Sequence, residues 1–244
     1  MAEKSKEKWT EIELLPQWEE KYYDVYTARK HGKWVMLKTL KEKYKADPRM
    51  QAMFEKEFEV RYNLSHPNIV MINDYEEVPG LGLCIITDDV YGTSLRTLID
   101  TKAVTPEHIR QITTRLVDAI DYIQTNHIVH FPIRPETIIF TENIGNLKLI
   151  DVGFDQAQQL SPAAAAEDIQ AFGRVLSESL AATPEPPAYL HRIADRCTSG
   201  RPYASVHQLR MALARRSAPY LYVALIAFLL LMFVILAWLT HSGR

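Results

Sequence analysis

The stretch from Tyr220 to Leu239 constrains the fold of this 244-residue chain more than any other feature. Its twenty residues include no charged residue, no glycine and no proline, so a helix formed by them would be apolar on every face. Such a helix is about 30 Å long, close to the thickness of the hydrocarbon core of a bilayer. A buried core helix is the alternative, but this run is apolar on every face and unusually long for one. We therefore expect residues 220–239 to form a transmembrane helix.

Basic residues flank this segment unequally. Three arginines precede it, Arg210, Arg215 and Arg216, whereas only Arg244 follows it. Lys and Arg near the end of a span favour the cytoplasmic side of the membrane. We therefore expect a single-pass membrane protein whose preceding domain is cytoplasmic, with these three arginines facing the lipid headgroups.

Shorter segments complete this arrangement. Residues 1–11 are expected to form a polar segment, residues 217–219 a short linker before the span, and residues 240–244 a short tail after it. The N-terminal sequence MAEKSKEKW has no apolar run that could act as a signal peptide. Together these features predict a tail-anchored protein that contacts the bilayer through residues 220–239.

The composition is that of a globular domain with an appendage. Hydrophobic residues make up 47% of the chain and charged residues 24%. A formal net charge of −2 argues against a general nucleic-acid-binding protein, which normally carries a strongly basic face, so we expect no nucleic-acid partner. Cys84 and Cys197 match no metal-ligand or redox spacing, and we expect two reduced, buried thiols.

Apolar patterns predict mainly strands in the first part of the chain and helices later. The expected strands are residues 33–40, 69–75, 83–87, 138–140 and 147–150. The expected helices are residues 48–64, a long helix that begins at 105–107, and residues 164–180, 189–197 and 206–216. This order indicates an α+β fold, with a small β-rich lobe followed by a mostly helical lobe.

Two charged residues lie within apolar patterns of the first lobe. Lys38 shares a strand face with Met36 and Leu40; taken alone, it would be an edge-strand lysine with a solvated tip. Glu57 lies seven residues from Met50 on the expected helix, within an apolar stripe. A carboxylate buried in such a stripe needs a cation to offset the cost of removing it from water.

Two further features follow in the second lobe. Asp151 comes directly after the short strand LKLI and leads into Val152-Gly153. The loop at residues 130–137 lies between the long helix and a strand. Functional side chains are frequently carried by loops that regular elements position, so both places are candidates for chemistry.

In this order, the features resemble the eukaryotic-type protein kinase family. Residues 35–38 (VMLK) resemble its lysine-bearing strand, and Glu57 stands at the spacing of its helix glutamate. Residues 130–140 (HFPIRPETIIF) resemble its catalytic loop, and residues 150–153 (IDVG) its metal-binding segment. The resemblance runs from about residue 12 to residue 216. It implies a two-lobed protein-kinase-like fold, with an N-lobe at about 12–88 and a C-lobe at about 89–216.

The sequence departs from the family pattern at the positions of the phosphate-binding loop, the catalytic base and one metal ligand. The glycine positions of the phosphate-binding loop fall on Trp18, Glu20 and Tyr23, and these side chains prevent the close backbone approach that glycine permits. Pro132 occupies the position of the catalytic base and cannot accept a proton. Thr137 replaces the asparagine that would hold a second metal ion. We therefore predict no functioning catalytic residue.

Four residues of the family's nucleotide site remain. The resemblance implies that Lys38 and Glu57 keep an ion pair, that Asp151 keeps one carboxylate for Mg²⁺, and that Arg134 replaces the loop lysine. These four residues would form a vestigial nucleotide site that binds ATP and Mg²⁺ weakly or not at all.

Three functions fit these observations. The first is a membrane-anchored pseudokinase that acts as a signalling or scaffolding module and holds a cytoplasmic protein partner at the membrane face. The second is an atypical active ATP-dependent protein kinase of the Ser/Thr type, in which another carboxylate replaces the missing base. The third is an architectural protein of a membrane assembly. We take the first as the working hypothesis.

Overall fold

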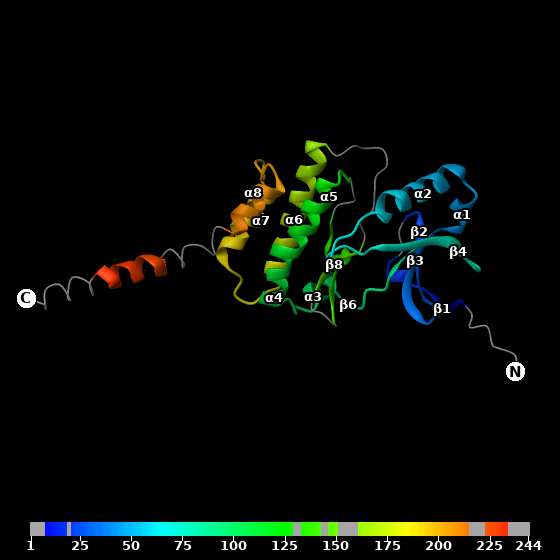
Figure 1. Cartoon of the computed structure of the whole chain (residues 1–244), viewed down its shortest axis with the longest axis horizontal. Helices are drawn as coiled ribbons and strands as arrows, with labels where there is room; N and C mark the ends of the chain where they lie inside the picture. Colours follow the sequence, from blue (N-terminus) through cyan, green and yellow to red (C-terminus); the bar gives the residue numbers. More distant parts are fainter. Residues whose placement is uncertain are drawn as a thin grey trace, which may run out of the picture.

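The computed structural model describes residues 8–18, 21–128, 133–142, 146–150, 161–214 and 223–233. These residues form a small lobe built on a β-sheet and a larger, mostly helical lobe, which lie side by side along the length of the molecule (Figure 1). The two-lobed α+β fold expected from the sequence is confirmed.

A five-stranded antiparallel sheet forms the N-lobe, with its strands in the order β1-β2-β3-β5-β4. The strands are β1 (Trp9–Leu14), β2 (Tyr23–Lys30), β3 (Lys33–Leu40), β4 (Ile72–Val78) and β5 (Gly82–Asp88). A two-residue turn with φ of 52° at His31 and 86° at Gly32 connects β2 to β3. Positive φ at both central residues is what a type I′ hairpin turn requires.

Two helices accompany the sheet, α1 (Glu42–Lys45) and α2 (Pro48–Tyr62). The side chain of Asp47 caps α2 by accepting a hydrogen bond of 2.9 Å from the backbone N–H of Arg49, and proline fits the first helical position. Phe54 of α2 packs with Leu40 of β3 and Ile85 of β5 on one face of the sheet. This packing places the buried side chain of Glu57 on α2 next to β3.

Ion pairs join β2 to the far edge of the sheet. Nζ of Lys30, at the end of β2, lies 2.7 Å from Asp74 and 2.6 Å from Glu76, both on the edge strand β4. Lys8, just before β1, also pairs with Glu76. Because β3 and β5 lie between β2 and β4 in the sheet, these contacts require a strongly curled sheet. The inner face of the curl holds a second small core around Trp9 and Leu37.

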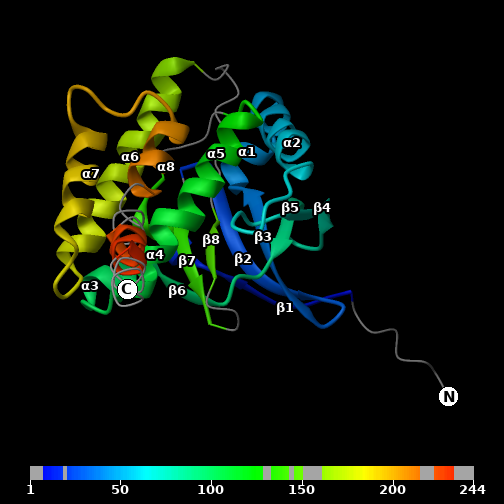
Figure 2. The ribbon, with the colours of Figure 1, turned by 60° about the vertical axis from the view of Figure 1, so that its left-hand side comes forward.

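The C-lobe contains a short three-stranded sheet and a set of packed helices (Figure 2). Its strands are β6 (Gly92–Ser94), β7 (Ile138–Thr141) and β8 (Leu147–Leu149). Its helices are α3 (Leu95–Asp100), α4 (Pro106–Gln111), α5 (Val117–Thr125), α6 (Pro162–Ala181), α7 (Ala188–Thr198) and α8 (Val206–Ala214). One large core, centred on Leu116, Ile120 and Phe172, fills the space between these elements.

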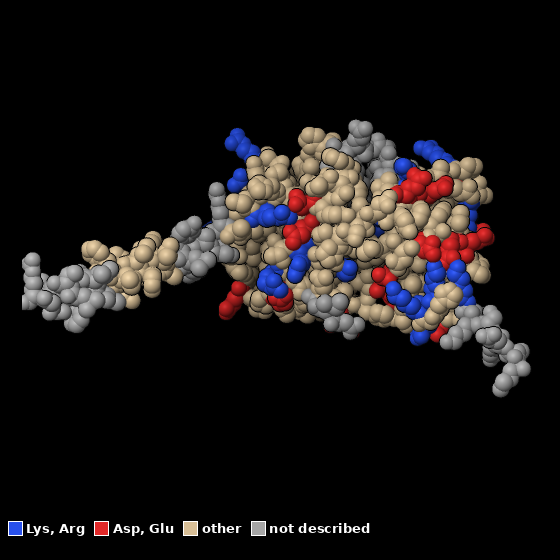
Figure 3. All heavy atoms as spheres, in the orientation of Figure 1, with Lys and Arg blue, Asp and Glu red and all other residues tan. Residues whose placement is uncertain are grey.

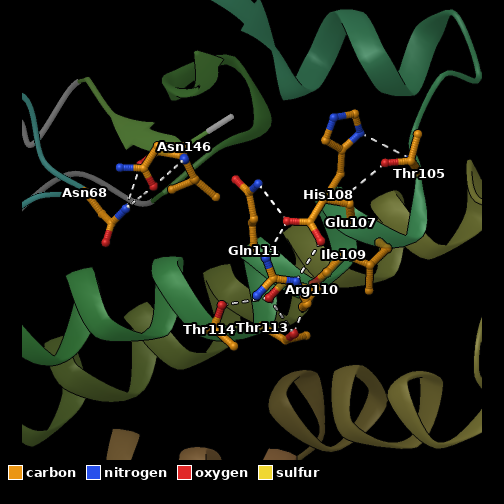
Figure 4. A network of polar contacts seen from close by, with 11 residues as sticks. Asn68, Thr105, Glu107, His108, Ile109, Arg110, Gln111, Thr113, Thr114 and Asn146 are labelled. Carbon is orange, nitrogen blue, oxygen red and sulfur yellow. Dashed lines mark hydrogen bonds and ion pairs between the residues drawn. The ribbon is translucent and has the colours of Figure 1, made fainter. Parts of the chain in front are cut away.

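The long helix expected to begin at 105–107 is continuous but contains one π turn. Residues Ile112–Leu116 connect α4 to α5 with π geometry. Side-chain hydroxyls of Thr113 and Thr114 donate to the backbone carbonyl of Arg110 at 3.0 and 2.8 Å, as Figure 4 shows. Such bonds back to the preceding turn compete with the helical ladder, which accounts for a local change in winding.

The structure corrects several predicted boundaries. The strand expected at residues 69–75 is β4, which begins at Ile72, and β1 begins at Trp9, within the expected polar segment at residues 1–11. The sequence patterns predicted none of β1, β2, β6, α1 and α3. Cys84 and Cys197 are free and buried as predicted. Burial raises the pKa of their thiols to about 11 and about 12, so both remain protonated at neutral pH.

The predicted membrane span lies only partly within the described residues. Residues 223–233 are helical, and all eleven side chains are exposed. This helix is the tan segment without charged side chains that lies apart from the two lobes in Figure 3. Residues 220–222 and 234–239 lie outside the described residues. Within the described part, none of the helices has the length and hydropathy to cross a membrane.

A close contact between α6 and α7 provides a test of the C-lobe packing. A Cβ added at Gly173 of α6 would lie 2.5 Å from Cβ of Cys197 and 3.1 Å from the carbonyl oxygen of Ala194, both on α7. We expect Gly173→Ala to cost about 1–3 kcal/mol through overpacking, offset by at most about 1 kcal/mol of helix propensity. Urea denaturation measures the difference. Gly200→Ala, whose Cβ would meet nothing within 4 Å, is the control and should be close to neutral.

Candidate functional site

A cleft of about 540 Å³ lies between the two lobes. The N-lobe wall includes Val25, Met36, Lys38 and Arg61, and the C-lobe wall includes Ser94, Arg134, Glu136 and Thr137. Three predicted site residues therefore fall at this cleft: Lys38 and Arg134 line it, and Glu57 lies directly behind Lys38.

Glu57 pairs with two cations at once. Its Oε1 lies 3.2 Å from Nζ of Lys38 and 2.7 Å from Nη1 of Arg61. The side chains of Glu57, Arg61 and Lys38 are 5%, 4% and 13% exposed. The sequence predicted that Glu57 needs a cation and assigned Lys38 to it. It missed Arg61, although the spacing of four residues along one helix is a readable signal for an ion pair.

Local structure explains how these three side chains meet. Lys38 points to the same side of β3 as the buried Met36 and Leu40, because side chains alternate along a strand. That side faces α2, whose buried stripe includes Glu57 and, one turn later, Arg61. The triad therefore links the sheet to α2 through a single carboxylate.

Two of the three positions that the resemblance assigns to glycine are occupied by aromatic residues, Trp18 and Tyr23. The ring centroid of Tyr23 lies 4.2 Å from Nζ of Lys38 and 5.5 Å from the ring of Phe54. Tyr23 is buried and attracts the ammonium group through its π face. Trp18 ends a 3₁₀ turn between β1 and β2 and lines the cleft. Glu20, at the third position, lies outside the described residues.

The C-lobe wall is organised by backbone capping and by one ion pair. The hydroxyl of Thr137 donates to the backbone carbonyl of Arg134 at 3.0 Å and accepts from the backbone N–H of the same residue at 3.4 Å. Glu136 accepts a hydrogen bond of 2.8 Å from Arg96. Burial raises the pKa of Glu136, but the hydrogen bond from Arg96, a backbone hydrogen bond and the positive charges of Arg96 and Arg134 together outweigh burial and hold the pKa below its usual value.

Asn68 fixes the connection between the lobes. Its buried side-chain amide donates to the carbonyl of Leu147 at 2.8 Å and to the side chain of Asn146 at 2.9 Å (Figure 4). Its backbone carbonyl accepts from the N–H of Leu149 at 2.8 Å. The segment that follows α2 is thereby tied to β8, the strand that leads to Asp151. Asp151 itself, predicted as a magnesium ligand, and Pro132 lie outside the described residues, so their roles stay predictions.

Of the three arginines predicted to face the membrane, the structure describes only Arg210. Nη2 of Arg210 on α8 lies 3.0 Å from Asp118 and 3.0 Å from Asp121, both on α5. Two carboxylates therefore already offset its charge, and its contact with lipid headgroups stays a prediction. Arg215 and Arg216 lie outside the described residues.

The shared carboxylate predicts unequal effects of substitution in the triad. Glu57→Gln removes the buried carboxylate that Arg61 and Lys38 share, and we expect it to lower the free energy of unfolding by about 3–5 kcal/mol. Lys38→Met leaves Glu57 paired with Arg61 and should cost clearly less. Urea denaturation of the full chain in detergent gives both values, with the exposed Lys56→Met as a control. A Lys38→Met cost equal to that of Glu57→Gln would contradict this assignment.

Comparisons with known proteins agree with this geometry. The protein kinase domain model matches residues 21–172, more than half of the chain. A probable serine/threonine-protein kinase of Streptomyces coelicolor is 31% identical over 140 residues, 55% of this chain and 21% of that protein. Serine/threonine-protein kinase PrkC of Bacillus subtilis is 32% identical over 124 residues, 50% of this chain and 19% of PrkC. The matched part thus spans about a fifth of the length of these relatives.

The same fold is found among solved structures. The crystal structure of the Mycobacterium tuberculosis PknI kinase domain superposes with a TM-score of 0.63 at 22% identity. The superposition covers 86% of this chain and 96% of the PknI domain. The cleft, the Lys38–Glu57 pair and the family match lead to one conclusion: this chain belongs to the protein kinase domain family.

Proposed function

We propose that this chain is a kinase-fold binding module that does not transfer phosphate, held at the cytoplasmic face of a membrane by residues 220–239. In this function the cleft and the helical lobe present surfaces to a protein partner, and the membrane segment sets where that partner gathers. The partner would be a cytoplasmic protein of a signalling or scaffolding assembly.

The aromatic side chains of Trp18 and Tyr23, at two of the three glycine positions, are the observation that carries the proposal. Phosphoryl transfer needs the triphosphate cradled closely by backbone N–H groups, and glycine permits this approach because it has no side chain. Here the ring of Tyr23 lies on the ammonium group of Lys38, and Trp18 lines the cleft. The first glycine of the chain is Gly32, which lies beyond the segment that connects β1 to β2. Large aromatic side chains at these positions are poorly suited to positioning a triphosphate for transfer.

The opposite wall supports the same proposal. Proline at position 132 has no group that can accept the proton of an acceptor hydroxyl. The hydroxyl of Thr137 is occupied by the backbone of Arg134 and is not presented as a metal ligand. Under this proposal Lys38 and Glu57 are retained because, with Arg61, they hold α2 against the sheet.

The exposed helix at residues 223–233 supports the membrane part of the proposal. Its side chains include Val223, 65% exposed, and Phe233, 71% exposed. Exposing eleven consecutive side chains of this kind to water is unfavourable, at roughly 25 cal/mol for each Å² of apolar surface. A bilayer removes that surface from water, and the uncharged sequence continues on both sides of this helix from Tyr220 to Leu239.

An active serine/threonine kinase is the second candidate. It is favoured by the relatives, which are named as serine/threonine kinases, and by the Lys38–Glu57 pair at an open cleft. In that case the magnesium ligand would be Asp151, and a carboxylate outside the pattern would act as base.

A transfer assay separates these two candidates. We expect the purified full chain in detergent to transfer no radiolabelled phosphate from ATP and Mg²⁺ to itself or to casein beyond the level of Lys38→Met. The Lys38→Met variant is the matched control because it removes the lysine of the nucleotide site. Transfer by the unmodified chain that disappears in Lys38→Met would overturn the proposed function and establish the kinase.

A flotation assay tests the membrane part. The full chain reconstituted with phosphatidylcholine vesicles should float with them even at high salt, because apolar burial is not screened. Leu229→Lys combined with Leu230→Lys should abolish flotation, since each charge at the centre of a span costs about 2.5–3.5 kcal/mol. Met211→Lys, at an exposed apolar residue of α8, is the control. Flotation that is unaffected by the double substitution would refute the span.

A further inference from the structure

The last two helices of the C-lobe carry an unusual balance of charge. Residues 188–216 contain six arginines and one acidic residue, Asp195, in a chain whose formal net charge is −2. No lysine occurs among these residues. The helices α7 and α8 form the end of the C-lobe from which the chain continues towards residues 223–233 (Figure 1). The end of the domain next to the apolar helix is therefore basic, although the chain as a whole is slightly acidic.

Three of these arginines are exposed to solvent. Arg192 and Arg196 lie four residues apart on α7, so their side chains share one face of the helix, and Arg201 lies in the loop that follows. Within the described part of the chain, no carboxylate forms an ion pair with any of the three, whereas Arg210 is held by two carboxylates of α5. We call Arg192, Arg196 and Arg201 the arginine face.

A buried tyrosine holds the central member of the arginine face. The guanidinium carbon of Arg196 lies 4.4 Å from the ring centroid of Tyr203, which is 5% exposed. Stacking engages the flat face of a guanidinium group, and its N–H donors point outward from the edge, where they match two oxygens of a phosphate. Tyr203 lies in the same loop as Arg201, so this contact also ties that loop to α7. The arginine face is therefore suited to phosphate groups.

The chain itself limits the distance between the arginine face and the expected span. The helix α8 has nine residues and is about 13 Å long, so the loop at its start lies close to its end at Ala214. Only residues 215–219 separate Ala214 from Tyr220, and even a fully extended chain of this length covers roughly 20 Å. The headgroup region takes up part of that length, and its charges act over a Debye length of about 8 Å. The basic end of the C-lobe is therefore held near the lipid headgroups.

We propose that Arg192, Arg196 and Arg201 bind the headgroups of anionic phospholipids and so dock the helical lobe on the membrane. The inference rests on the membrane part of the proposed function. Each basic side chain close to an anionic leaflet favours contact roughly fivefold, so three favour it about a hundredfold over a neutral leaflet. The N-lobe lies at the opposite end of the molecule (Figure 1), so docking through α7 leaves the N-lobe turned away from the membrane.

Hydrogen exchange of the full chain in vesicles tests the proposal. The chain is reconstituted into phosphatidylcholine vesicles and into an equimolar mixture of phosphatidylcholine and phosphatidylserine, and exchange is followed in the peptide that spans residues 198–207. We expect exchange in this peptide to be at least about fivefold slower in the anionic vesicles at low salt, because bound headgroups restrict opening of the loop. High salt should restore the rate seen in neutral vesicles, since it screens the contact.

Substitution of the arginine face provides the matched comparison. The triple variant Arg192→Gln, Arg196→Gln and Arg201→Gln should exchange at the same rate in both kinds of vesicle, and unchanged protection of α6 would show that it is folded. The control variant Lys43→Gln, Arg49→Gln and Lys56→Gln removes three exposed positive charges from the N-lobe instead. It should keep the slower exchange in anionic vesicles.

The possible outcomes separate this inference from the proposed function. Equal exchange of the unmodified chain in both kinds of vesicle, or slowing that persists in the triple variant, would overturn the docking. Slowing in phosphatidylcholine vesicles on addition of inorganic phosphate would assign the arginine face to a free phosphate and would also overturn it. Failure of the chain to float with phosphatidylcholine vesicles would refute the span, which is tested without any anionic lipid.

Discussion

One carboxylate holds the N-lobe and the cleft together. Glu57 is buried on α2, and a charge buried without a partner is so costly that the fold must bring a cation to it. Lys38 arrives from β3 and Arg61 from the next turn of the same helix. The position of α2 against the sheet, the inner wall of the cleft and the placement of Arg61 all follow from satisfying this one group.

Residues with a strong local pattern could be predicted from the sequence, and those placed by tertiary contacts could not. The alternation along β3 predicted the side of the strand on which Lys38 lies. The apolar stripe of α2 predicted that Glu57 is buried and therefore needs a cation. Arg61 was missed because it corresponds to no motif of the family, although its spacing from Glu57 was readable. The predicted start of β4 was wrong because Ile69 and Val70 do not belong to the N-lobe sheet. They are buried where the segment after α2 pairs with Leu149 of β8.

Elements with few apolar residues were the hardest to predict. The strand β1 reads WTEIEL, in which Trp9 and Ile12 are three residues apart because the pairing with β2 is irregular between Thr10 and Glu13. The strand β6 has three residues, GTS, and is defined by its pairing with β7. At the glycine positions the sequence was informative, but the contacts were not. The absence of glycine was plain in the sequence, but the contact between Tyr23 and Lys38 depends on the register of β2 with β3, in which Val25 lies opposite Lys38.

The ion pairs between Lys30 and β4 have a consequence for how this protein can recruit others. An exposed strand at the edge of a sheet can accept a strand from another chain, and charged side chains on the edge discourage this. Both edges of the N-lobe sheet carry acidic residues, Glu11 and Glu13 on β1 and Asp74 and Glu76 on β4. Addition of a strand from another chain is therefore disfavoured at both edges of the N-lobe sheet.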